Sequence, residues 1–127
     1  MDCGAFPIFV EMLAGGHDDE KREAAWALVN AMMPQNKEQL DKLVEVESVE
    51  YLMKYVQNVP NLPAALYNAI VRGFRNLAAA DTKYTLIVKE KLTDDVLAIL
   101  MANTDYSIYQ TLNDAINKPE LEMQKVN

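Results

Sequence analysis

Apolar residues recur along this chain in a pattern whose period is roughly 43 residues. Each unit predicts a short helix, a second helix and a longer third helix, because its apolar residues lie three and four positions apart. We predict the long third helices over about residues 19–33, 64–80 and 106–117. A unit of this kind cannot bury its apolar face alone, so the pattern favours a stack in which each unit covers the next.

The shorter helices and the turns mark three units. We predict the first helices over about 36–46 and 84–91, and the second helices over about 6–13, 48–56 and 94–101. The first unit has no opening helix. Pro119 is expected to close the last helix, because proline lacks the N–H that continues a helix. We therefore expect one repeat domain over 1–117, with units of about 1–35, 36–80 and 81–117, and a polar, frayed tail over 118–127.

The period lies in the range of ~40–47 residues that is typical of HEAT and armadillo repeats. About three such repeats are the usual minimum for a stable stack. The predicted fold is therefore all-α, an armadillo-repeat α-solenoid of about three repeats.

Composition narrows the classes of partner. The net charge is −7, which disfavours a nucleic-acid surface, since phosphate binding needs a basic face. Acidic proteins attract basic partners, although solubility alone explains the charge equally well.

No apolar run approaches the ~20 residues of a membrane span. The single cysteine, Cys3, allows no intrachain disulfide, which fits the cytosol or the nucleus, and it has no basic neighbour that would make it a nucleophile.

Two runs resemble the importin-α family, the armadillo adaptors that recognise nuclear localisation signals. The run from Gly4 to Leu13 (GAFPIFVEML) is similar to the family's second-helix sequence, and the run from Arg22 to Asn30 (REAAWALVN) is similar to its third-helix sequence. The resemblance implies that the third helices line a concave face that holds an extended basic peptide. It also implies basic segments of cargo proteins and nuclear transport receptors as partners, a place in cytoplasm and nucleus, and neither an enzymatic activity nor a cofactor.

By this resemblance, Trp26 would form a slot for a lysine and Asn30 would bind the peptide backbone. Residues i and i+4 share one helix face, and a Trp–Lys contact contributes ~0.5–2 kcal/mol. Alignment of the long helices puts Arg72 at the place of Trp26 and Asn76 at the place of Asn30. Arg72 would repel a lysine, and could bind an acidic side chain or a C-terminal carboxylate instead.

Other interpretations of these residues remain open. A lone tryptophan on a helix is more often a core residue than a ligand contact, and helical asparagines are commonly surface residues. In the third unit, Asn113 and Asn117 align with Trp26 and Asn30, but there we favour a surface role near a helix end. His17 lacks the further ligands that a metal site needs. The residues show no catalytic set.

The alternative function is a degenerate armadillo scaffold for protein–protein interaction or self-association, without signal binding. Two features motivate this alternative: the missing first helix and the loss of tryptophan after the first unit. We would then expect uncapped ends of the stack to pair with other helices or with a second copy of the chain.

Overall fold

The computed structural model describes the backbone of residues 3–34 and 36–126 and the side chains of residues 4–34 and 36–117. These ranges contain helices and no strand, which confirms the predicted all-α class. After a short 3-10 helix, Cys3–Ala5, the α-helices are α1 (Phe6–Gly15), α2 (Asp18–Ala31), α3 (Lys37–Glu45), α4 (Ser48–Asn58), α5 (Ala64–Ala80), α6 (Thr82–Lys91), α7 (Asp94–Asn103) and α8 (Tyr106–Val126).

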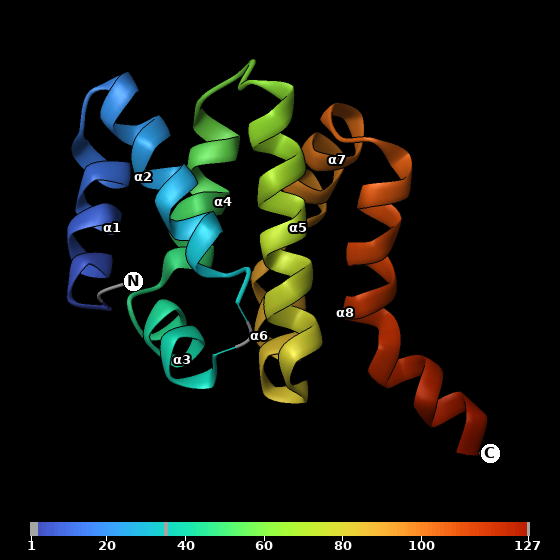
Figure 1. Ribbon diagram of the computed structural model, residues 1–127. Coiled ribbons are helices and arrows are strands. Elements are labelled where there is room, and N and C mark those ends of the chain that lie inside the picture. Colours follow the sequence, from blue (N-terminus) through green and yellow to red (C-terminus); the bar gives the residue numbers. More distant parts are fainter. Residues whose placement is uncertain (1–2, 35, 127) are drawn as a thin grey trace.

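The last helix is the main departure from the prediction. We expected it to end near Asn117 and expected Pro119 to close it, but α8 continues to Val126. Proline removes one backbone hydrogen bond and crowds the preceding turn. Where the flanking residues favour a helix, proline kinks the helix and does not always end it. Figure 1 shows α8 changing direction in its C-terminal part. The expected frayed tail is therefore helical up to Val126.

The long helices α2, α5 and α8 lie side by side and run in the same direction (Figure 1). Helix α5 packs between the other two. Helices α1, α4 and α7 pack in the same order in a second row, and α3 and α6 lie toward one end of the molecule. Helices from neighbouring predicted units therefore contact their counterparts. None of the helices in the described ranges combines the length and apolar composition needed to cross a bilayer.

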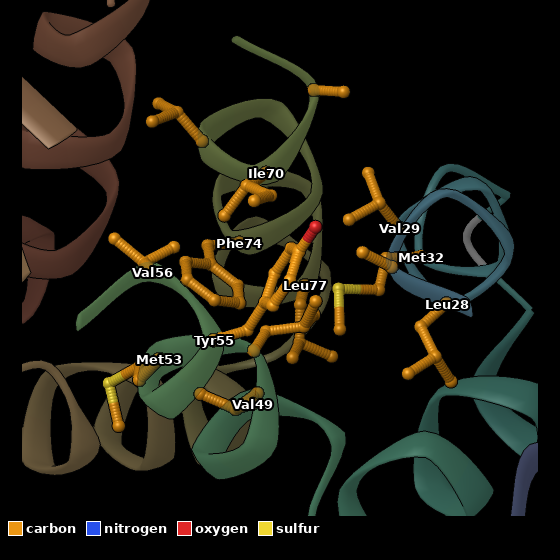
Figure 2. Close-up of a cluster of buried hydrophobic side chains, with 14 of the residues drawn as sticks. Leu28, Val29, Met32, Val49, Met53, Tyr55, Val56, Ile70, Phe74 and Leu77 are labelled. Atoms are coloured by element: carbon orange, nitrogen blue, oxygen red, sulfur yellow. The ribbon is translucent and has the colours of Figure 1, made fainter. Parts of the chain in front are cut away.

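The core lies between the two rows. Val29 and Met32 point from the α2 segment toward α5 (Figure 2). On the α5 side, Phe74 lies among Ile70, Leu77, Val56 and Tyr55. The side chains of Leu28 and Phe74 are fully buried. Burial of a large apolar side chain contributes about 1.5–3 kcal/mol, so this cluster is a main source of stability.

Gly73 sets how closely α2 and α5 approach each other. A Cβ atom at this position would lie 3.2 Å from Cγ1 of Val29 and 3.3 Å from Sδ of Met32. Both contacts are tighter than ordinary van der Waals separation. Glycine therefore lets the two long helices pack closely at this point, although it costs about 1 kcal/mol of helix propensity relative to alanine.

A side chain from the following short helix binds the last turn of each of the first two long helices. Gln39 of α3 donates from Nε2 to the carbonyl oxygen of Ala31 at 2.7 Å, and the Thr85 hydroxyl of α6 donates to the carbonyl oxygen of Ala78. The last carbonyl groups of a helix have no partner within it. These buried bonds satisfy two of them and fix the angle at which the chain turns into the next helix.

A polar cluster joins α3 to α6 at the surface. The Tyr84 hydroxyl donates to Asp41, and Nζ of Lys83 lies 3.1 Å from Oδ1 of Asp41. Nζ of Lys37 lies 3.4 Å from Oδ2 of Asp81. Hydrogen bonds from Tyr84 and Lys83 lower the pKa of Asp41 below its ordinary value of 3.8, and the backbone N–H of Lys83 lowers the pKa of Asp81.

These shifts predict an acid-dependent stability. A carboxyl whose folded pKa is depressed stabilises the fold above its unfolded pKa and loses that contribution as pH falls through the folded pKa. We expect Asp41→Asn to be less stable than wild type at about pH 7, and the difference to disappear below the lowered pKa of Asp41. Urea unfolding followed by circular dichroism at about pH 7, 4 and 2 would measure this.

The control for this prediction is Glu90→Gln on an exposed face of α6. It removes one negative charge without touching the cluster. An Asp41→Asn effect that is equal at all three pH values would contradict the ionic origin of the contribution.

Candidate functional site

The predicted peptide-binding residues lie on the two long helices that pack together first along the chain. Trp26 and Asn30 belong to α2, and Arg72 and Asn76 belong to α5. Trp26 is partly buried against the core and partly accessible, while Asn30 and Arg72 are exposed. Among the described side chains, neither the Asn30 amide nor the Arg72 guanidinium has a hydrogen-bond or ionic partner. Both groups are therefore available to a ligand.

Asn76 on α5 is already engaged by other side chains. Its Nδ2 lies 2.9 Å from Sδ of Met33, and its Oδ1 accepts a hydrogen bond from Nη1 of Arg75 at 2.9 Å. The backbone N–H of Met33 in turn donates to the carbonyl oxygen of Asn30 at 3.3 Å. Met33 therefore links the C-terminal end of α2 to Asn76 on α5. Asn76 would have to give up or share these contacts in order to bind a peptide backbone.

The third long helix, α8, carries Asn113 and Asn117, which the sequence alignment matches with Trp26 and Asn30. Asp114, the residue after Asn113, is exposed on the same helix. Asn117 donates from Nδ2 to the carbonyl and side-chain oxygens of Asn113, at 2.9 and 3.2 Å. Both asparagines are therefore occupied by contacts within α8.

A cavity of about 320 Å³ lies between α5 and α8. Its lining contains one cation and one anion, together with small side chains: Arg75, Ala79, Thr111, Asp114 and Ala115. Within the described side chains, Arg75 and Asp114 form no ion pair with each other. Sequence reasoning missed both residues, because it searched for a repeat of tryptophan and asparagine and not for charge. The sequence did contain one signal of charge on this surface, namely Arg72 and Arg75, which lie three residues apart on one predicted helix.

The acidic residues before Trp26 begin α2. The backbone N–H of His17 donates to Oε1 of Glu20 at 3.0 Å, and Asp18, Asp19 and Glu20 fill the first turn, where negative charge favours a helix N-terminus. No group of three or more His, Cys, Asp or Glu side chains in the described ranges is placed to hold a metal ion. The side chain of Cys3 lies outside the described residues.

Comparison with known proteins assigns no relative: no family model, no curated protein and no solved structure matches this chain.

Proposed function

We propose that this chain is a short armadillo-type α-solenoid that binds an extended, Lys- or Arg-containing peptide of the nuclear localisation type across α2, α5 and α8. The observation that carries the proposal is the placement of Trp26 and Asn30 one turn apart on α2, both accessible, beside a second long helix that runs parallel to it. The asparagine amide offers both a donor and an acceptor to a peptide backbone. The indole offers a face to a lysine.

The order of the helices supports the solenoid. In each row, neighbouring helices come from successive predicted units. One row is α2, α5 and α8, and the other is α1, α4 and α7. In such a stack, one row of helices forms a continuous surface along which weak contacts can add up. The proposed role is that of an adaptor that carries cargo segments between cytoplasm and nucleus.

Truncation of the two residues tests the proposal. We expect Trp26→Ala to weaken binding of a labelled nuclear localisation peptide by about 2- to 30-fold, which corresponds to ~0.5–2 kcal/mol for the lost cation–π contact. Asn30→Ala should weaken it further, because a backbone contact is lost. Fluorescence anisotropy would measure both effects, with a charge-matched scrambled peptide as the reference ligand.

Two variants provide matched controls. Tyr106→Ala removes an aromatic side chain that is 70% exposed on α8, and Gln57→Ala removes an exposed amide on α4. Both should leave affinity unchanged. If folded Trp26→Ala/Asn30→Ala protein binds the peptide as tightly as wild type, this face is not the binding site.

A scaffold that self-associates is the second candidate. Ile8 on α1 and Met101 on α7, the outer helices of their row, are 57% and 50% exposed. Sedimentation velocity over a range of concentrations separates the two functions. A dimer that forms whether or not the peptide is present would favour the scaffold.

A further inference from the structure

Residues of different charge character lie on the three neighbouring long helices, and we propose that together they select a peptide of alternating charge. Trp26 is partly exposed on α2, Arg72 is exposed on α5 and Asp114 is exposed on α8, and α5 packs between the other two helices. An aromatic face attracts a cation, a guanidinium attracts a carboxylate, and a carboxylate attracts a cation. The row therefore matches ligand charges in the order positive, negative, positive. This inference rests on the proposed function, because it takes the peptide to cross these helices.

The surroundings of Trp26 strengthen the first of these preferences. Asp19, Glu23, Trp26 and Asn30 are four, three and four residues apart, so they share one face of α2. Asp19 and Glu23 are exposed on that face. A lysine that packs against the indole would therefore lie within a negative field.

The surroundings of Arg72 have the opposite sign. Arg72 is exposed and without a charged partner in the described ranges, and Arg75 follows one turn later with Nη1 bound only to the neutral Asn76 amide. Neither guanidinium forms an ion pair within the described side chains, although the chain has a net charge of −7. They would repel the central lysine of a uniformly basic peptide and attract a glutamate or aspartate.

Asp114 restores a negative site on α8. It is exposed and accepts a hydrogen bond from Nε2 of Gln110 at 2.8 Å, which leaves its other carboxylate oxygen available. The cavity between α5 and α8, lined by Arg75 and Asp114, gives room for the ligand segment that passes from the one charge to the other.

The distance between helices sets the spacing of the ligand charges. Packed helices lie about 8–10 Å apart, and an extended peptide advances about 3.2–3.4 Å per residue. One helix therefore corresponds to about three peptide residues. The expected ligand is Lys-x-x-Glu-x-x-Lys, whose charge order is the same in either chain direction, so the inference does not depend on the direction of binding.

The test compares three labelled peptides with blocked termini. The first is Lys-x-x-Glu-x-x-Lys, the second is Lys-x-x-Lys-x-x-Lys, and the third has the composition of the first in scrambled order. At about 150 mM salt, where the Debye length is about 8 Å, long-range attraction to the acidic chain is suppressed. We expect wild type to bind the first peptide about tenfold more tightly than either of the others. Attraction by net charge alone would favour the second peptide.

A charge reversal at the central position completes the test. Arg72→Glu should reverse the preference, so that the all-basic peptide binds more tightly than the alternating one. Lys54→Glu on the exposed face of α4 makes the same change in net charge away from these helices, and should keep the wild-type order.

The outcomes separate this inference from the proposed function. If the all-basic peptide binds wild type as tightly as the alternating one, and Trp26→Ala still weakens its binding, charge alternation is overturned and the peptide-binding face stands. If Arg72→Glu leaves the preference unchanged, alternation is overturned too. If no peptide binds, or if folded Trp26→Ala protein binds all three as wild type does, both proposals are overturned.

Discussion

Replacement of Phe74 by alanine is expected to lower the free energy of unfolding by about 3–5 kcal/mol. The Phe74 ring is fully buried and lies at the centre of the cluster between the two rows of helices (Figure 2). Its truncation removes apolar contacts with α4 as well as within α5, and the rigid helices around it can close the cavity only in part. Domains of this size have a total stability of about 5–15 kcal/mol, so the variant should be only marginally folded at 37 °C.

Urea unfolding at 25 °C, followed by far-ultraviolet circular dichroism, would measure the change. Tyr106→Ala is the matched control, since it truncates an aromatic side chain that is 70% exposed and should alter stability by no more than about 0.5 kcal/mol. A cost of less than about 1 kcal/mol for Phe74→Ala would show that the ring does not organise the core.

Replacement of Gly73 by leucine is expected to push α2 and α5 apart. A Cβ at this position already lies 3.2 Å from Val29 and 3.3 Å from Met32, and leucine adds three further carbons in the same direction. Overpacking of this kind costs about 1–3 kcal/mol. The same substitution gains helix propensity, since glycine is about 1 kcal/mol less favourable than alanine in a helix, so the cost must be isolated by comparison.

Gly15→Leu supplies that comparison. Gly15 is also helical, but a Cβ there would meet no atom within 4 Å, so leucine brings propensity without crowding. We expect the free energy of unfolding of Gly73→Leu to be about 1–3 kcal/mol lower than that of Gly15→Leu. Equal stabilities would mean that the α2–α5 contact has room to expand. Thermal unfolding in parallel would check the order of the two variants.

The helices were largely predictable because the sequence places strong signals at their ends. The bounds of α5 match the prediction, Ala64–Ala80, since Pro63 precedes its first residue and Asp81 caps the next helix by accepting a hydrogen bond from the backbone N–H of Lys83. The predicted end of α8 was wrong. A proline ends a helix only where it opposes the helix more strongly than the flanking residues favour it. That balance cannot be judged from a single residue.

The candidate site was predictable in part. The spacing of Trp26 and Asn30 places both on one accessible side of α2, and the prediction of Arg72 and Asn76 puts them on the neighbouring helix. The engagement of Asn76 by Met33 could not be predicted, since the two residues lie 43 positions apart and meet only after α2 and α5 have packed. Asp114 was not predicted, because the sequence search sought tryptophan and asparagine on this helix, and the cavity that Asp114 lines forms only when α5 and α8 pack together.

The central position of α5 also bears on motion. Helices α2 and α8 each have α5 as their neighbour in the row of long helices, whereas α5 has a neighbour on both sides. Local opening of either flanking helix disrupts one such contact, whereas opening of α5 disrupts two, so the free energy of local opening should rise toward the middle of the row. Arg72 would then be held on the most rigid segment of the surface, while Trp26 and Asp114 could adjust around it. An incoming chain would meet a fixed central contact and two compliant outer ones.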